Sequence, residues 1–403
     1  MTKQNEKQNE KQNEAAEQVA PSNRLNILHA AFFTPMSGGD WGLPLMLWGE
    51  PGTTKTATIK MFARRFGWHM ERIAPGARGE GAFGVTPVPL VTDHGTVLTY
   101  PPPDYAHKLA RGGVVFVDEI NTLPPALQPA ALDMVQERQI GSFRYAGQVR
   151  VIGAANPTAH AAGGWDFSPA QANRMGHIDW PAPEVEGWAD WLLAGADLGD
   201  EKPMDPEKEE ARVMKLWPEA FAKASGLVTA FLRTRPELLH KLPKDGDPAQ
   251  SRAWPSTRTW EYTTRAFASA LVHNLNPVDR DAFGTAFIGA GPFGELMTFV
   301  EENDLPSPSE LLDGKVKFAH DPERLDRTYA VLNACAALVT PKEAAKRNDR
   351  GEALWQLMGA IAEDAKDVLV PAMTAMIRAQ LKTASAKTLM AKMHSVVTTA
   401  GAV

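Results

Sequence analysis

Cysteine and long apolar runs are nearly absent from this sequence. Its 403 residues include one cysteine, Cys335, so no internal disulfide can form and the fold does not depend on an oxidising compartment. Because the neighbours of Cys335 are apolar, we expect a buried thiol that packs as a small hydrophobe. No apolar run approaches the roughly 18 residues that a membrane-spanning helix needs, so we expect no membrane span.

Excess basic charge and an apolar leader are also missing. Lys and Arg number 42 against 48 Asp and Glu, and the formal net charge of −6 argues against sequence-independent binding to nucleic acid, which needs a concentrated basic surface. The chain opens instead with three polar copies of Lys-Gln-Asn-Glu over Lys3–Glu14. Such a segment cannot bury enough apolar surface to offset its ordering entropy, so we expect a disordered tail over residues 1–22. A cytoplasmic location is the simplest expectation.

The rest of the chain divides by pattern into an α/β part and a helical part. Short apolar runs alternate with helical patterns over residues 23–181, which is typical of a parallel sheet covered by helices. The clearest predicted strands are Leu43–Trp48, Val114–Val117 and Val149–Ala154. Beyond Pro181 the strand patterns stop. We therefore expect a helical domain over residues 182–300 and a helical extension over residues 301–403.

A glycine-rich loop stands between the first predicted strand and a helical pattern. It reads Gly-Glu-Pro-Gly-Thr-Thr-Lys-Thr (Gly49–Thr56), and the order of strand, loop and helix predicts a phosphate-binding P-loop. Lys55 would reach the β- and γ-phosphates, and the hydroxyl of Thr56 would ligate Mg²⁺. Thr54 stands just before the lysine, where glycine is usual. The residues expected to bind the nucleotide are Gly49, Pro51, Gly52, Thr53, Thr54, Lys55 and Thr56.

Two carboxylates follow the second predicted strand. Val114–Val117 has no polar alternation, as expected for a strand buried on both faces, and Asp118 and Glu119 come directly after it. Acids at the end of a buried strand are costly unless something pairs with them, and a magnesium nucleotide at the same sheet edge would do so. Asp118 would hold the metal through its water shell, and Glu119 would act as general base on the attacking water.

Three further polar residues carry weaker signals. Asn156 follows the third predicted strand, where its amide could orient the water or where Asn156-Pro157 could simply form a turn. Arg174 ends the segment Ser-Pro-Ala-Gln-Ala-Asn-Arg, and Arg258 stands at the start of a helical pattern. Isolated arginines are usually surface residues, so these two gain a functional interpretation only from the whole set.

The ordered set resembles the AAA+ ATPases and, within them, the MoxR-like group. The motifs that carry this resemblance lie at residues 49–56, 117–121, 128–132, 137–141, 154–157, 168–174 and 255–261. The resemblance extends over roughly residues 23–270. It implies Walker A at Gly49–Thr56, Walker B at Asp118, a catalytic Glu119, sensor 1 at Asn156, an arginine finger at Arg174 and sensor 2 at Arg258.

The resemblance also implies a fold, ligands and partners. The expected fold is an α/β P-loop AAA+ core with a parallel sheet, followed by an all-α lid and a helical C-terminal extension. ATP and Mg²⁺ are the implied ligands. Arg174 would reach the γ-phosphate of a neighbouring subunit in a homo-hexameric ring, although the residue before it is Asn173 where the family usually has Asp. Arg258 would contact the phosphate of its own subunit. The implied partner is a protein substrate, in many relatives one with a von Willebrand A domain.

The sequence also predicts where four aromatic residues pack. Phe83 lies in a glycine-rich segment, Pro75–Val85, where the family holds an insertion near the pore. It would be either a mobile contact to the substrate or a loop residue packed on the core. Trp180, Trp188 and Trp191 are expected to pack in the core or against the lid.

Two other functions stay open at this stage. A nucleic-acid-dependent NTPase, such as a restriction or helicase-like motor, could use the same core, but the acidic net charge and the lack of a recognisable DNA-binding module disfavour it. A nucleotide-bound scaffold that does not hydrolyse ATP is favoured only by Thr54 and Asn173. Kinase, dehydrogenase and metalloprotease functions are disfavoured, because the sequence has no helix-opening Gly-x-Gly-x-x-Gly and no His-Glu-x-x-His.

Overall fold

The core of the molecule is a five-stranded parallel sheet. The computed structural model describes residues 24–74, 82–84, 86–110, 112–124, 126–157, 164–193, 203–303, 305–381 and 383–393. The strands run in the spatial order β2-β5-β8-β1-β9 and all neighbours are parallel. Their bounds are β1 Leu45–Trp48, β2 Met70–Ile73, β5 Gly113–Val117, β8 Val149–Ala155 and β9 Gly176–Asp179.

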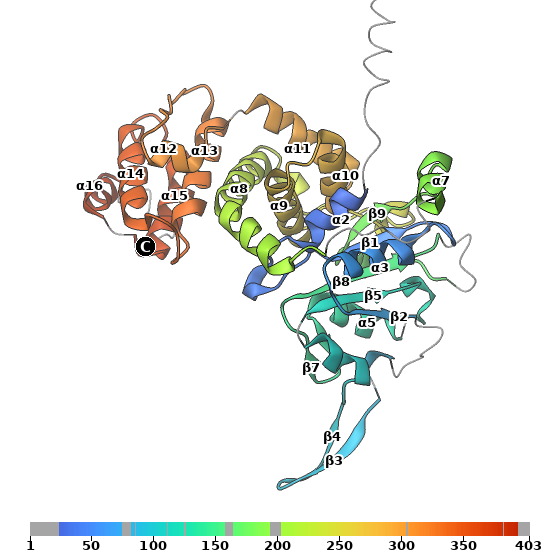
Figure 1. Ribbon diagram of the computed structural model, residues 1–403. Coiled ribbons are helices and arrows are strands. Elements are labelled where there is room, and N and C mark those ends of the chain that lie inside the picture. The colour runs from blue at the N-terminus through green and yellow to red at the C-terminus, as the bar shows by residue number, and fades with distance from the viewer. Residues whose placement is uncertain are drawn as a thin grey trace, which may run out of the picture.

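Apolar side chains of the strands point to both faces of the sheet. Leu45 and Leu47 join one hydrophobic cluster with Phe62 of helix α3, whereas Met46 and Trp48 join a second cluster with Leu132 of helix α5. The central strands β5 and β8 are buried at every position. This burial on both faces explains why their sequences lack polar alternation. The core is therefore a three-layer arrangement of helices, sheet and helices (Figure 1).

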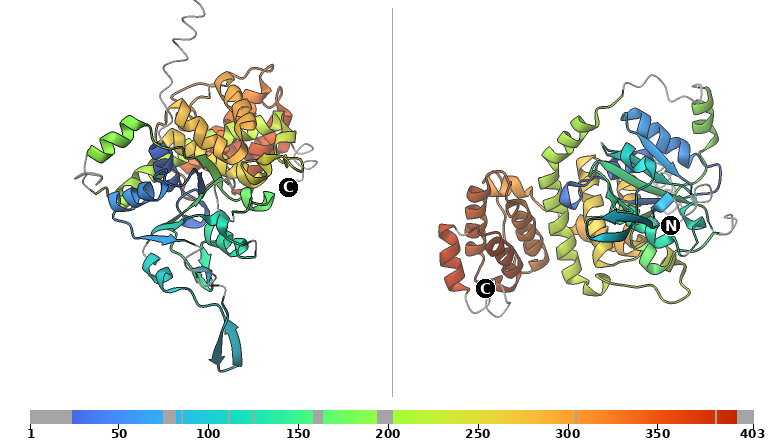
Figure 2. Two further views of the ribbon diagram at one scale, coloured as in Figure 1. Left: turned by 90° about the vertical axis from the view of Figure 1, so that its right-hand side faces the viewer. Right: turned by 90° about the horizontal axis from the view of Figure 1, so that it is seen from below.

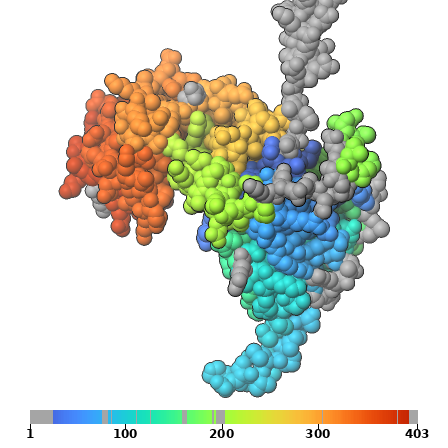
Figure 3. Space-filling view, in the orientation of Figure 1, coloured from blue at the N-terminus to red at the C-terminus, as the bar shows by residue number. Residues whose placement is uncertain are grey.

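Helices and short hairpins complete the core. Its helices are α2 Arg24–Phe32, α3 Lys55–Arg65, α5 Gln128–Gln136 and α6 Pro169–Ala172. The two hairpins are β3 Val88–Thr92 with β4 Gly95–Thr99, and β6 Gln139–Ile140 with β7 Phe143–Arg144. The 3₁₀ turns are η1 Ser37–Gly39, η3 Asp104–Leu109, η4 Ile120–Thr122, η5 Pro236–Leu238 and η6 Pro248–Ser251. The β3–β4 hairpin projects far from the body of the core (Figures 1 and 3).

The second half of the chain is helical. Beyond Asp179 the described residues contain no strand. The first group of helices comprises α7 Val185–Leu193, α8 Pro206–Thr234, α9 Thr257–Val272, α10 Pro277–Ile288 and α11 Ala290–Glu302. The last group comprises α12 Pro308–Leu312, α13 Leu325–Val339, α14 Arg347–Ala360, α15 Lys366–Arg378 and α16 Ala384–Lys392. None of the described helices combines the length and apolar character needed to cross a membrane.

The long helix α8 connects the two helical groups. Its 29 residues extend over about 44 Å, and it packs against α9 on one side and α13 on the other (Figure 2). Gly226 permits the second contact, because a Cβ there would lie 2.5 Å from the carbonyl oxygen of Ala330 on α13. The C-terminal helices thus stand beyond α8, away from the sheet (Figure 2).

The expected fold class is confirmed, namely an α/β core with a parallel sheet followed by helices. The three predicted strands are observed within two residues of their predicted ends. The strands β2 and β9 were not predicted, because each has only four residues and includes charged or polar side chains. The domain boundaries after residues 22, 181 and 300 remain a prediction, and the polar repeat of residues 1–22 lies outside the described residues.

The expectations for individual side chains have mixed outcomes. Cys335 is buried, as predicted. Phe83 is 2% exposed within the second hydrophobic cluster, so it is a packed core residue and not a mobile contact. Pro75–Gly81 and Val85 lie outside the described residues, as does the side chain of Trp191. Trp180 is buried as expected, whereas Trp188 on α7 is 46% exposed and so departs from the packing prediction.

Candidate nucleotide-binding site

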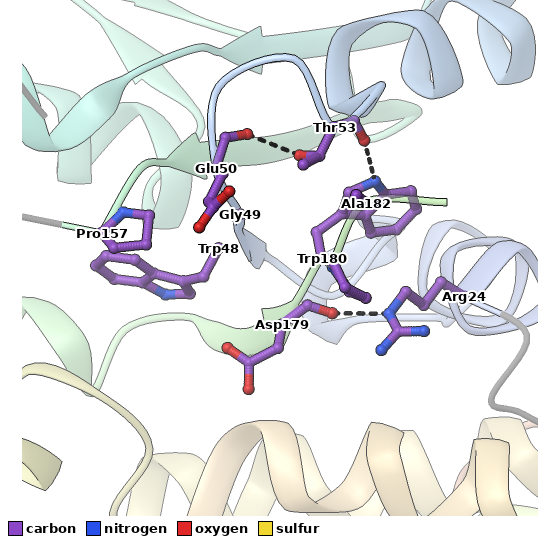
Figure 4. A pocket seen from close by; sticks show the side chains of 10 residues that line it. Arg24, Trp48, Gly49, Glu50, Thr53, Pro157, Asp179, Trp180 and Ala182 are labelled. Atoms are coloured by element: carbon purple, nitrogen blue, oxygen red, sulfur yellow. Dashed lines mark hydrogen bonds between the residues drawn. The ribbon is translucent and has the colours of Figure 1, made fainter. Parts of the chain in front are cut away.

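The glycine-rich loop joins β1 to α3, as the motif predicts, and Trp180 holds it in place. The backbone N–H of Trp180 donates to the carbonyl of Trp48, and its indole N–H donates to the carbonyl of Thr53 at 3.0 Å (Figure 4). Gly49 is required by this close packing, because a Cβ at that position would lie 2.1 Å from the Trp180 carbonyl oxygen. Trp180 therefore fixes both ends of the loop, a role that the sequence did not reveal.

Thr54 has a left-handed backbone conformation, with φ 67° and ψ 5°, immediately before α3. This is the position where glycine is usual, and glycine adopts that conformation without steric cost. For a β-branched residue it costs on the order of 1–3 kcal/mol. The loop thus keeps the left-handed backbone that is typical of glycine, although the residue is threonine.

Lys55 is buried in the loop, and its ammonium group has several acceptors. Nζ donates to the carbonyls of Gly49 at 2.7 Å and Glu50 at 2.9 Å, and to Oδ1 of Asn156 at 3.1 Å. Burial lowers the pKa of Lys55, and the nearby carboxylates of Asp118 and Glu119 oppose that shift. The structure therefore brings together the lysine, the two acids and the asparagine that the sequence predicted.

Thr56 and Asp118, the two residues predicted to hold a metal, lie in contact. The Thr56 hydroxyl donates to Oδ2 of Asp118 at 3.1 Å, and the Asp118 side chain is 8% exposed. Hydroxyl and carboxylate oxygens are the hard donors that Mg²⁺ prefers. The donor types fit a magnesium ion that Thr56 would ligate and that Asp118 would hold through its water shell. The same Oδ2 also pairs with Arg72, whose Nη2 lies 2.7 Å away.

Glu119 follows Asp118 in a second left-handed turn, with φ 55° and ψ 39°. Its side chain is exposed, and its backbone carbonyl accepts from the N–H of Thr122 at 2.9 Å. The chain turns at Glu119, so that its side chain is exposed whereas that of Asp118 is buried. An exposed carboxylate beside the P-loop is accessible to water, as a general base must be.

Asn156 lies at the carboxyl end of β8, between the P-loop and the Walker B strand. Besides accepting from Lys55, it receives a hydrogen bond at its carbonyl from Nδ2 of the fully buried Asn121 at 2.8 Å. Asn156 is itself 7% exposed. This fixed, buried position supports the interpretation of Asn156 as a site residue over that of a simple turn former.

A cavity of about 420 Å³ opens beside the P-loop (Figure 4). Its lining comes from the end of β1, the loop, the end of β9 and the first residue of α2, and it includes Arg24, Trp48, Gly49, Thr53, Asp179 and Trp180. The Arg24 Nε donates to the carbonyl of Asp179 at 2.7 Å (Figure 4). The cavity is continuous with residues of the phosphate loop, so it can receive the part of a nucleotide that extends from the phosphates.

Arg174 lies near the amino ends of the strands, whereas the P-loop lies at their carboxyl ends. It precedes β9, whose first residue, Gly176, is in register with Leu45 at the start of β1. The P-loop begins after the other end of β1, so the two positions are separated by about 13 Å along the strand direction. The Nε of Arg174 is buried and has no hydrogen-bond partner among the described residues. Arg174 is therefore not part of the cluster around Lys55.

Arg258 belongs to the first turn of helix α9. Ser256, the N-cap of α9, donates to Oδ1 of Asn173 at 2.6 Å, so Arg258 stands near the segment that carries Arg174. Helix α9 is held against the start of the core, where the Ser269 hydroxyl donates to the carbonyl of Ala30 at 2.9 Å. The expectation that Arg258 contacts the phosphate of its own subunit stays a prediction. The Asn173–Ser256 contact is one that the sequence does not reveal.

Comparison with known proteins gives a partial family match. Residues 106–162 match the sequence model of the Sigma-54 interaction domain, an AAA+ domain, and this segment contains Asp118, Glu119 and Asn156. No curated protein matches the chain. A solved structure of a candidate ATPase from Cytophaga hutchinsonii covers 70% of this chain and 89% of its own, at 16% identity and a TM-score of 0.46. That likeness carries no weight beside the strand order and the P-loop geometry.

The observed architecture fits the α/β fold of the AAA+ ATPases. The sheet with its P-loop after β1 and its paired acids after β5 supports a nucleotide-binding AAA+ core. Two charged residues near this site were missed from the sequence. Arg252 lies with its guanidinium carbon 3.9 Å from the ring centre of Trp48 and its Nη1 3.2 Å from Oδ1 of Asp179. Arg72 could have been found only by recognising β2, which ends at the same sheet edge as Asp118.

Proposed function

We propose that this chain is an ATP-hydrolysing AAA+ motor of the MoxR-like group that remodels or matures a partner protein as an oligomeric ring. The observation that carries the proposal is the convergence of Lys55, Thr56, Asp118 and Asn156 at one edge of the sheet. Lys55 Nζ lies 3.1 Å from Asn156 Oδ1, and Thr56 Oγ1 lies 3.1 Å from Asp118 Oδ2. Glu119 completes the set as the exposed carboxylate.

Each side chain has a distinct chemical role in this proposal. The loop N–H groups and Lys55 neutralise the phosphates, while Thr56 and Asp118 hold Mg²⁺. A bound Mg²⁺ supplies further charge stabilisation at the phosphate oxygens. Glu119 accepts a proton from the water whose oxygen attacks the γ-phosphorus, and Asn156 orients that water. The γ-phosphoryl group leaves ADP as inorganic phosphate.

The position of Arg174 supports the proposed ring. A finger at the far edge of the sheet cannot complete its own site, but it can complete that of a neighbouring subunit. Such fingers contribute about 10³–10⁵ in turnover in other NTPases. The Asn173–Ser256 bond ties Arg174 to the start of α9, so Arg258 belongs with the same face of the subunit. We propose a homo-hexamer whose substrate is a protein, with a von Willebrand A domain partner.

The first test is ATP turnover in Mg²⁺ against protein concentration. Wild-type activity should rise cooperatively, Glu119→Gln should lose about 10²–10⁴ in rate and Arg174→Ala about 10³–10⁵. Mixing the two variants should restore part of the activity, because a Glu119→Gln subunit supplies Arg174 to a neighbour with an intact Glu119. The control is Arg378→Ala, an exposed arginine on α15, which should behave as wild type.

Three results would change the proposal. Turnover unaffected by Arg174→Ala would refute the finger in trans. Absence of hydrolysis with retained nucleotide binding would favour the scaffold function, which the left-handed Thr54 and the replacement at Asn173 support. Stimulation of turnover by DNA that disappears with salt would favour a nucleic-acid motor.

A further inference from the structure

Three donors share a single oxygen of Asp118. Arg72 reaches Oδ2 with Nε at 2.8 Å and Nη2 at 2.7 Å, and the Thr56 hydroxyl reaches the same atom at 3.1 Å. This arrangement satisfies the carboxylate of a residue that is 6% exposed. The Walker B acid therefore has a cationic partner from its own chain, supplied by the edge strand β2.

The two partners differ in their freedom to move. The Asp118 side chain is 8% exposed and the Arg72 side chain 49% exposed. The backbone N–H of Asp118 donates to the carbonyl of Ile73 at 2.8 Å, which fixes the acid against β2. Because β2 is the outermost strand, the guanidinium can swing into solvent without leaving a cavity behind. The acid stays in place while the arginine can leave.

A guanidinium and a hydrated divalent cation would compete for this carboxylate. Both would be held by the same carboxylate, and like charges at contact distance repel strongly where water is partly excluded. We infer that Arg72 is a built-in counter-ion that occupies Asp118 in the nucleotide-free site and must be displaced when a metal–nucleotide complex binds. This inference rests on the proposed function, since it concerns the metal site of the same nucleotide.

The displacement has a physical purpose. Without a ligand, Asp118 would be a buried carboxylate beside a second acid, Glu119, and such groups are costly when unpaired. Arg72 lowers this cost in the empty site, and it raises the metal concentration needed to fill it. The metal therefore enters mainly with a nucleotide, whose phosphates add the binding energy that displaces Arg72.

The experiment measures metal binding directly, with Mn²⁺ in place of Mg²⁺ and ADP as the nucleotide. The free Mn²⁺ signal in electron paramagnetic resonance is followed as Mn²⁺ is added to the full chain in excess over ADP. Arg72→Met should tighten Mn²⁺ binding roughly fivefold, as expected for loss of one half-exposed competing ion pair. Arg72→Lys, which keeps the charge but not the paired donors, should give a smaller gain. The control is Lys60→Met, an exposed charge on α3, which should leave the affinity unchanged.

Salt provides a second measurement that a purely structural role would not affect. Because the competing pair is half-exposed, the difference between wild type and Arg72→Met should shrink as ionic strength rises. Equal or weaker Mn²⁺ binding by both Arg72 variants would overturn the inference. If Arg72→Met is unfolded by circular dichroism, Arg72→Lys alone decides between these outcomes. Failure of the wild type to bind Mn²⁺ with ADP would instead overturn the nucleotide site itself.

Discussion

Buried cations stand at both ends of the central sheet, and their surroundings differ. At the amino end, Arg150 of β8 is 1% exposed and donates to the carbonyls of Phe32 and Gln148 and to Glu210 on α8. Aromatic rings cover its guanidinium, with the centre of the Trp68 ring at 4.5 Å from the guanidinium carbon. At the carboxyl end, the ammonium group of Lys55 donates to the carbonyls of Gly49 and Glu50, to the Thr53 hydroxyl and to the Asn156 amide.

This difference separates a structural cation from a functional one. The partners of Arg150 come from α2, from Gln148 just before β8 and from α8, so the arginine connects the core to the long helix. The acceptors of Lys55 belong to one loop and one strand end, and a phosphate can compete with them. A buried charge fully enclosed by its own protein stabilises the fold, whereas one with exchangeable partners serves a ligand.

The largest expected effect comes from breaking the amino-end site. Arg150→Met should lower the free energy of unfolding by about 3–5 kcal/mol, because it leaves Glu210 as an uncompensated, largely buried charge. Denaturant unfolding measures this loss. The control is Arg144→Met, which removes an arginine that is 60% exposed and paired with Asp40, and should cost about 0–1 kcal/mol. The folded fraction of Arg150→Met should bind ADP normally, and weakened binding would contradict the separation of roles.

The carboxyl-end site should respond in the opposite way. Lys55→Met should weaken nucleotide binding by roughly 10- to 100-fold, the value of one hydrogen-bonded charge. Its free energy of unfolding without nucleotide should fall by much less than that of Arg150→Met. Calorimetric titration with ADP measures the affinity, and Lys60→Met on the same helix is the matched control. A loss of stability as large as that of Arg150→Met would show that Lys55 is structural as well.

The smallest expected effect concerns the backbone of the loop. Thr54→Gly should raise the free energy of unfolding by about 1 kcal/mol, because relief of the left-handed strain exceeds the added entropy of the unfolded glycine. Thr58→Gly, the same change inside α3, should instead lower it by a few tenths to about 1 kcal/mol. Denaturant unfolding of both variants gives the two signs. A destabilising Thr54→Gly would mean that the threonine side chain makes contacts that outweigh the strain.

The sequence alone predicted those site residues that follow apolar strands of the sheet. Asp118 and Asn156 come directly after apolar strands, Lys55 follows the apolar β1 and its glycine-rich loop, and parallel strands bring their carboxyl ends to one edge. Arg72 was not predicted as a site residue, because β2 is short and its pattern includes two charged residues. Local periodicity cannot reveal such an edge strand, since pairing with β5 is what defines it.

The helical half shows the same limit at longer range. Its helical character follows from the loss of strand patterns after Pro181, and this was predicted. The position of Arg258 was not, because it depends on the contact between Asn173 and Ser256, which are 83 residues apart. Capping residues such as Ser256 predict where a helix begins, but not which surface it meets.

The burial of Cys335 gives this chain a practical property. It is the only cysteine in the sequence, it is 0% exposed on α13, and burial raises the pKa of its thiol to about 12. Since the thiolate is the reactive form, the thiol of the folded protein should not react with maleimide and similar reagents. A cysteine introduced at an exposed site, such as the turn of the β3–β4 hairpin, would then be the single position that reacts with a fluorophore or spin label. Distances between subunits of the proposed ring could then be measured without first removing the natural residue.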